Sequence, residues 1–142
     1  MLLELVKKFG DAFLLELDDA EFLDSELSSF PCGSCEVTSQ MLALYLESQG
    51  VDNVVYTRNK TNSLEVGSIH YWVVADNTII DLTAHQFEEF YGHCFLPLNS
   101  KFHAKFTQLS KHFPDINSLS RSYAGHRYLS FYENVIKRIE NS

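Results

Sequence analysis

Two cysteines three residues apart, Cys32 and Cys35, lie in the stretch FPCGSCE at residues 30–36 and are the side chains best suited to chemistry. Such a pair can form a redox-active dithiol, supply half of a metal site, or contain one nucleophilic thiol with an incidental neighbour. Each interpretation requires different companions elsewhere in the chain. The rest of the sequence therefore discriminates between them.

The sequence lacks the further features that a redox dithiol or a metal site requires. A thioredoxin-like dithiol follows a buried strand, but an acidic, serine-rich stretch, 18–31, precedes Cys32. A zinc site needs two further soft ligands at paired spacing. Cys94 follows His93 with no such pair, and the remaining histidines stand singly: His85, His103, His112 and His126. We therefore expect neither a metal nor a cofactor.

Cys35 meets the first requirement of a nucleophile. The pattern predicts a helix from Cys35 to Gln49, closed by Gly50, whose apolar residues cover more than one face, as in a central buried helix. Unpaired backbone N–H groups and the helix dipole favour a thiolate at its first residue. Cys32 lies one turn earlier and lacks that support, so Cys35 is the better nucleophile. Cys32 is a candidate partner for a reversible regulatory disulfide.

A histidine base and a carboxylate to orient it follow in a predicted β-hairpin. The runs IHYWVVA (69–75) and TIIDL (78–82) flank Asp76-Asn77, which suits a two-residue turn. In that register His70 and Asp81 share one face as diagonal neighbours about 7–8 Å apart, within reach of an imidazole–carboxylate hydrogen bond. A slip of one residue would place them on opposite faces, so the site depends on the turn.

These segments resemble the transglutaminase-like branch of the papain-like cysteine hydrolases. That superfamily presents a Cys at the start of a buried helix, a His in a later strand, often as H-x-W, and an Asp in the next strand before a Thr. Here the matching segments are Cys35, His70-Tyr71-Trp72 and Asp81-Leu82-Thr83, in the same order. The resemblance covers roughly residues 30–90 and implies an α+β fold in which the Cys-bearing helix packs on a small antiparallel sheet.

The resemblance further implies acyl transfer through a Cys35–His70–Asp81 triad. The thiolate would attack an amide or thioester carbonyl of a protein or peptide, with His70 as base and then acid, and Asp81 fixing the tautomer of His70. Water as acceptor gives proteolysis or glutamine deamidation, and an amine gives transglutamination. Papain-like enzymes often place a Gln before the cysteine as oxyanion donor, but this chain has no Gln before position 40. The donor beside the Cys35 backbone N–H is therefore not identified by the sequence.

Four further residues are expected to support the triad without reacting. Each lies within four residues of a triad member: Ser34, Ser39, Trp72 and Thr83. Ser34 occupies the expected helix N-cap, and Trp72 is interpreted first as core and second as a shield against water.

The remaining pattern completes an α+β domain that we expect to span residues 1–142 as a single unit. It predicts either one amphipathic helix over 2–28 or two that are separated at Gly10-Asp11, a strand at 53–57, a short helix over 83–92 and a terminal helix over 122–140. Three phenylalanines form a core or lid stripe: Phe102, Phe106 and Phe113.

Charge and cysteine content limit the partners and the compartment. The formal charge of −8 disfavours nucleic acid and anionic membranes. Three cysteines and no export signal or spanning segment indicate a cytoplasmic, bacterial-type protein, with delivery as an effector or toxin left open. The sequence leaves the oligomeric state open. It also leaves a second class of function open, a binding module that keeps the fold without catalysis.

Overall fold

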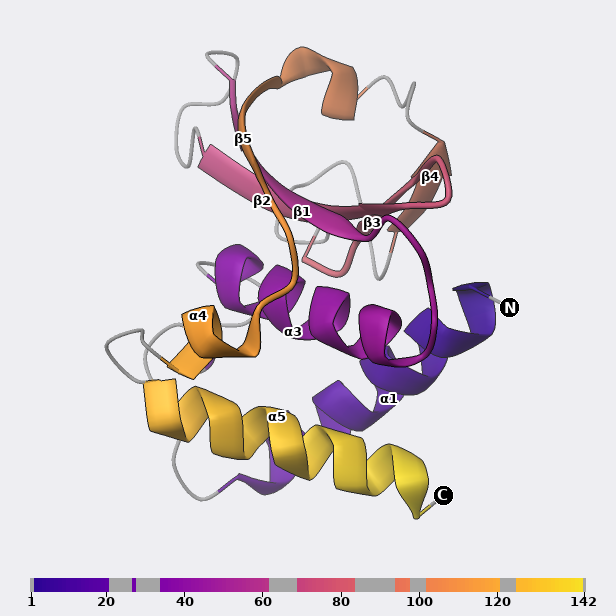
Figure 1. The fold of residues 1–142 in the computed structure, drawn as a ribbon, viewed down its shortest axis with the longest axis vertical. Helices are drawn as coiled ribbons and strands as arrows, with labels where there is room; N and C mark the ends of the chain where they lie inside the picture. The colour runs from indigo at the N-terminus through magenta and orange to yellow at the C-terminus, as the bar shows by residue number, and fades with distance from the viewer. Residues whose placement is uncertain are drawn as a thin grey trace.

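A computed structural model of the chain describes residues 2–20, 27, 34–61, 69–83, 94–97, 102–120 and 125–141. Its helices are α1 (Leu2–Asp19), α3 (Cys35–Ser48), η2 (a 3-10 helix, His103–Lys105), α4 (Ile116–Ser120) and α5 (Gly125–Glu140). Its strands are β1 (Val55–Lys60), β2 (Ile69–Ala75), β3 (Thr78–Asp81), β4 (Cys94–Pro97) and β5 (Thr107–His112). The expected α+β class is confirmed (Figure 1).

The strands form one antiparallel sheet in the order β4-β3-β2-β1-β5. The β2–β3 hairpin turns at Asp76 and Asn77, whose φ angles are 50° and 54°. Positive φ at both central residues is typical of a type I′ turn, which matches the twist of the strands it joins. Ala75 pairs with Thr78 across this turn, so the predicted register is confirmed.

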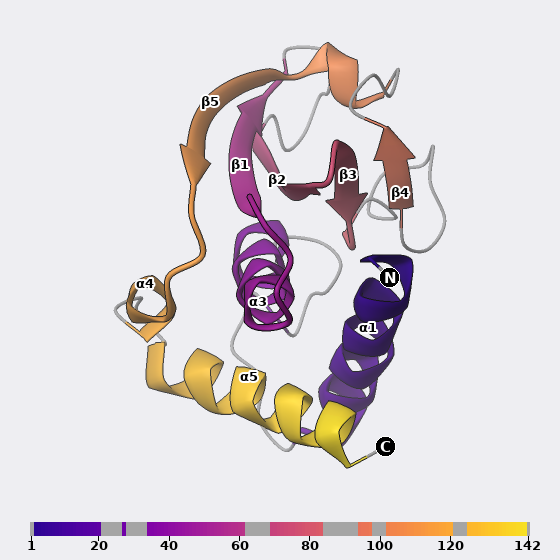
Figure 2. The same cartoon turned by 45° about the vertical axis from the view of Figure 1, so that its right-hand side comes forward.

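Helix α3 lies at the centre of the molecule, as its apolar pattern predicts. One side packs on β2 and β1, and α1, α4 and α5 pack on the others. Figure 2 shows α3 enclosed between the sheet, α1 and α5. Nine of its residues are buried: Val37, Thr38, Ser39, Met41, Leu42, Ala43, Leu44, Tyr45 and Leu46. Aromatic contacts tie it to α1, where the Phe9 and Tyr45 ring centroids are 5.6 Å apart.

The sequence places the end of α3 correctly. Gly50 has φ +86°, a left-handed conformation that costs glycine little. Its N–H bonds to the Glu47 carbonyl at 3.0 Å, and the Val51 N–H bonds to the Leu46 carbonyl at 3.1 Å. These bonds satisfy carbonyls that the helix end leaves without partners.

The structure decides between the alternatives for α1 and adds a strand that the sequence pattern does not predict. Helix α1 continues through Gly10, because Phe9, Gly10 and Phe13 are all buried and their packing outweighs the low helix propensity of glycine. Strand β5 has no counterpart among the predicted elements, since most of its side chains are exposed and give no alternating apolar signal. The predicted helix over 83–92 falls, beyond Thr83, outside the described residues.

Both faces of the sheet carry buried residues. Val73, Ala75 and Ile80 belong to the main hydrophobic core on the α3 side. The opposite face carries Thr57 paired with Trp72 and Asn59 paired with His70, all four of them buried. Within the described part of the chain, no helix has the length and apolar character needed to cross a membrane.

Candidate active site

Cys35 is the first residue of α3, the position the sequence predicts. It is a free thiol and is partly exposed. The thiol is hydrogen-bonded to the imidazole of His70 on β2. The N-terminal end of the central helix and the start of a central strand therefore bring the nucleophile and base candidates together.

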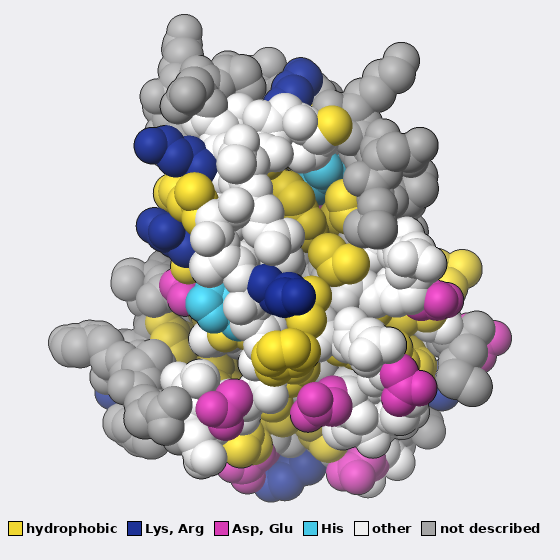
Figure 3. Space-filling model, turned by 45° about the horizontal axis from the view of Figure 1, so that its top comes forward, with side chains coloured by type: hydrophobic (Ala, Val, Ile, Leu, Met, Phe, Trp, Pro, Cys, Tyr) yellow, Lys and Arg dark blue, Asp and Glu magenta, His cyan; other side chains and the backbone are white. Residues whose placement is uncertain are grey.

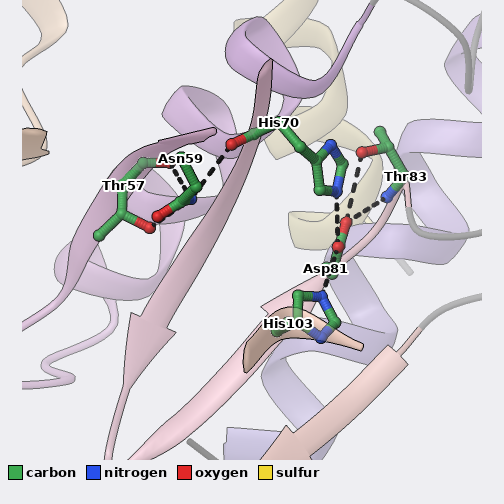
Figure 4. A network of polar contacts seen from close by, with 6 residues as sticks. All are labelled: Thr57, Asn59, His70, Asp81, Thr83 and His103. Carbon is green, nitrogen blue, oxygen red and sulfur yellow. Dashed lines mark hydrogen bonds and ion pairs between the residues drawn. The ribbon is translucent and has the colours of Figure 1, made fainter. Parts of the chain in front are cut away.

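His70 and Asp81 form the expected hydrogen bond. The His70 Nε2 atom lies 2.7 Å from Asp81 Oδ2, and both side chains are almost fully buried. Asp81 ends β3, and the two-residue turn places it on the His70 face of the sheet (Figure 4). Thr83 follows in the turn after β3, and its N–H and Oγ1 donate to Asp81 Oδ1 at 3.2 and 3.3 Å. Thr83 thus supports the carboxylate, as expected.

A second histidine, His103 of η2, contacts the same carboxylate oxygen. Its Nε2 lies 2.9 Å from Asp81 Oδ2, and the residue is only 3% exposed. Sequence reasoning missed this contact because His103 follows Asp81 by 22 residues and no motif joins them. The available signal is its neighbourhood, since Phe102 and Phe106 flank it and an imidazole among aromatic residues tends to be buried.

The hydrogen on Nε2 of both imidazoles follows from the ionised carboxylate, which carries no hydrogen and only accepts. His70 and His103 must therefore each donate from Nε2 to Oδ2. For His70 this leaves Nδ1 as the ring nitrogen that can interact with the Cys35 thiol. The Asp81 carboxylate accordingly selects the neutral His70 tautomer that carries its hydrogen on Nε2.

Electrostatics in the site stabilise charge on both partners. Burial lowers the pKa of His70, but the charge and hydrogen bond of Asp81, with a smaller contribution from Cys35, raise it to about 9. Burial raises the pKa of Asp81, but His70 and His103 outweigh it and lower the pKa to about 2. A protonated His70 beside an ionised Asp81 is therefore the stable state at neutral pH.

Asn59 of β1 is a further buried polar residue that the sequence did not single out. Its Nδ2 donates to the carbonyl of His70 at 3.1 Å, and to the carbonyl and Oγ1 of Thr57 at 3.0 and 2.9 Å. Figure 4 shows this amide on the strand next to His70. The contacts fix the backbone that carries the base.

Trp72 packs against the aromatic rings around His70 and covers this side of the site. It is 6% exposed and meets the rings of His103 and Phe106 edge-on, with centroid distances of 4.5 and 5.3 Å. Its ring centroid lies 5.7 Å from that of His70. Phe102 is buried beside His103, whereas Phe113 is 68% exposed and was wrongly grouped with the stripe.

The other expected residues lie as follows. Ser34 is buried at the N-cap of α3, but its side chain makes no capping hydrogen bond. Ser39 is buried one turn into α3. Gln40, the next residue of the helix and not one of the expected four, donates to the Tyr56 hydroxyl at 3.2 Å. Cys32, the proposed disulfide partner, lies outside the described residues.

Charge is unevenly distributed over the surface. Four described basic side chains of the sheet and η2 are exposed: Arg58, Lys60, Lys105 and Lys111. The view in Figure 3 shows lysine and arginine side chains over the upper part of the molecule and a row of aspartate and glutamate side chains across its lower part. Among the described residues, no three His, Cys, Asp or Glu side chains are grouped so as to hold a metal ion.

Comparisons with known proteins give one structural similarity. No protein-family model matches the chain, and no match is found among curated protein sequences. The solved structure of the catalytic domain of the Salmonella virulence factor SseI is 21% identical over 87% of this chain and 93% of that one, with a TM-score of 0.45.

Proposed function

We propose that this chain is a cysteine-dependent acyl-transfer enzyme that acts on amide bonds of proteins or peptides. The observation that supports it best is the linked set Cys35–His70–Asp81. A partly exposed thiol at a helix N-terminus contacts an imidazole, and a buried carboxylate holds that imidazole at 2.7 Å. A nucleophile, a base and a group that orients the base, in this order of contact, form an arrangement that performs nucleophilic acyl transfer.

The proposed chemistry uses the Cys35 thiolate as the nucleophile and the charged His70 as the proton donor. The thiolate sulfur attacks the substrate carbonyl carbon, and the carbonyl oxygen takes the electron pair. The backbone N–H groups that begin α3 can donate to this oxyanion, since the first N–H groups of a helix have no partner within the helix. His70 then gives its Nδ1 proton to the leaving amine as the carbon–nitrogen bond breaks.

The thioester formed on Cys35 is released by an acceptor. His70, now neutral, takes a proton from the acceptor as it attacks, and the thiolate leaves. Water as acceptor would give proteolysis or glutamine deamidation, and an amine would give transglutamination. The order of the three residues also agrees with the resemblance to transglutaminase-like, papain-like hydrolases, which supports this reaction class.

Alkylation of Cys35 by iodoacetamide tests the proposal without a known substrate. Labelling is measured by peptide mass spectrometry from pH 4 to 10 in the wild type, His70→Ala and His112→Ala. We expect fast labelling well below pH 8 that is lost in His70→Ala and kept in His112→Ala, because the ring of His112 stacks on Tyr56 and bonds to Ser110 rather than to Cys35. Cys94 of the same chain serves as an internal reference. An ordinary thiol profile, unchanged in His70→Ala, would overturn the proposal.

One observation favours a second candidate, a binding module that keeps the same arrangement. A cavity of about 500 Å³ lies between α1, the loop after α3 and the β2–β3 turn, and Cys35 is not among its lining residues. A module would bind its partner at such a place and need no reactive thiol. The two candidates are separated by the labelling experiment, because only the enzyme requires Cys35 to react faster than the reference cysteine.

A further inference from the structure

Two histidines donate to one oxygen of Asp81, although acyl transfer through a Cys–His–Asp triad requires only one. His70 Nε2 lies 2.7 Å and His103 Nε2 lies 2.9 Å from Oδ2 (Figure 4). The other oxygen, Oδ1, accepts two hydrogen bonds from Thr83. A carboxylate has about four acceptor positions. All four are therefore filled, and His103 fills the one next to His70.

Aromatic packing holds His103 in this orientation. Its ring meets Trp72 edge-on at 4.5 Å and 86°, and Phe102 at 5.2 Å and 85°. The side chain is almost fully buried, so it cannot turn to solvent without disrupting this packing. Trp72 in turn lies on β2 two residues after His70, which links the second histidine to the strand that carries the base.

The shared oxygen connects the two histidines electrostatically. The titratable groups facing His70 in the described part of the chain are Cys35 from α3 and Asp81 from β3, with His103 from η2 behind the carboxylate. Each hydrogen bond that Oδ2 accepts draws electron density toward its donor. His103 therefore weakens the attraction between Oδ2 and a protonated His70.

We propose that His103 is a positioning residue that fixes the Asp81 carboxylate and draws part of its charge away from His70, so that His70 can release its proton to the leaving group. This inference rests on the proposed function. A general acid works best when its pKa lies close to the pH at which it operates. The pKa of His70 is already about 9 with His103 in place. If Oδ2 of Asp81 presented more negative charge to His70, the His70 proton would be held more tightly and its transfer would be slower.

Two substitutions separate the hydrogen bond from the packing. His103→Phe keeps an aromatic ring against Trp72 and Phe102 but removes the donor. His103→Gln places an amide N–H near the position of Nε2 and keeps the donor. If the Phe variant does not fold, His103→Asn replaces it, because its shorter amide cannot reach that position. His112→Gln, which removes an imidazole distant from Asp81, is the matched control.

Titration of the His70 ring by NMR, with ¹³C-labelled histidine, is the direct readout. We expect the pKa of His70 to rise by about one unit in His103→Phe, a shift of the size that one charge-assisted hydrogen bond can produce. It should stay within about 0.3 unit of the wild type in His103→Gln and be unchanged in His112→Gln. The upper pH limit of Cys35 labelling by iodoacetamide should move with it.

Four results would overturn this role. The pKa of His70 could stay the same or fall in His103→Phe, or it could shift equally in His103→Gln, which would indicate a merely structural role for the ring. If wild-type Cys35 labels as an ordinary thiol, the proposed function fails and this inference fails with it. If labelling depends on His70 but not on His103, the proposed function stands and only the inference is lost.

Discussion

Asp81→Asn is the substitution that isolates the charge of the carboxylate. The amide has nearly the same shape, but it offers one oxygen where the carboxylate accepts from His70, His103 and Thr83 on two oxygens. The NH2 group of the amide replaces the other oxygen and must then face hydrogen-bond donors, to which it cannot act as acceptor. His70 therefore loses its negative partner while the surrounding packing is kept.

The size of the effect follows from the position of His70. Burial lowers the pKa of His70, and Asp81 is the main cause that raises it to about 9 from an ordinary 6.5. Without the carboxylate charge we expect a pKa of 6.5 or below. A drop of at least two units corresponds to roughly 3 kcal/mol. At pH 7 the protonated fraction of His70 would fall from nearly all to about a quarter or less.

NMR titration of His70 and iodoacetamide labelling of Cys35 at pH 7 measure this prediction. We expect the titration midpoint to drop below 7 and labelling to slow at least about fourfold, in proportion to the protonated fraction of His70. Asp76→Asn is the matched control, since it removes a carboxylate from the exposed turn of the same hairpin. A His70 midpoint that stays near 9 in Asp81→Asn, or shifts equally in Asp76→Asn, would refute the reasoning.

Three further predictions concern stability. The raised pKa of His70 contributes stability that is complete below about pH 6.5 and lost as the pH rises through about 9, and the lowered pKa of Asp81 contributes stability lost as the pH falls from about 4 toward 2. Thermal melts should thus show a maximum between about pH 4 and 6.5, and a flat profile up to pH 10 would contradict the buried pair. Asn59→Asp should cost about 2–4 kcal/mol in urea unfolding, because it sets a carboxylate against acceptors that the amide now donates to; the exposed Asn117→Asp should change stability little. Asn77→Gly should add about 0.5–1 kcal/mol, since glycine adopts the positive φ at lower cost, and a loss of stability would exclude a strained turn.

The hairpin and α3 could be predicted from the sequence because each rests on a local rule. Alternation of side chains along 69–75 and 78–82, with two residues between them, leaves one register that puts His70 and Asp81 on the same face. The continuous apolar character of α3 and the Gly50 end define the central helix in the same local way. The triad candidates follow from these two elements.

The rest of the site depends on contacts between distant segments that leave no periodic signal. His103 and Asn59 are single polar residues, and their burial is decided by how η2 and β1 meet the sheet. Strand β5 pairs with β1 through backbone hydrogen bonds, and its exposed side chains carry no core pattern. Tertiary pairing, rather than propensity, determines all three.

The β2–β3 turn also bears on when the thiol becomes reactive during folding. His70 and Asp81 are eleven residues apart and are joined by a two-residue turn, so their pairing closes only a short loop. Cys35 reaches them only when α3 docks against the sheet, a contact between segments 35 residues apart. Contacts of greater sequence separation form at a higher entropic cost. We therefore expect the nucleophile to be completed after the hairpin, so that an incompletely folded chain carries only an ordinary, unactivated thiol at Cys35.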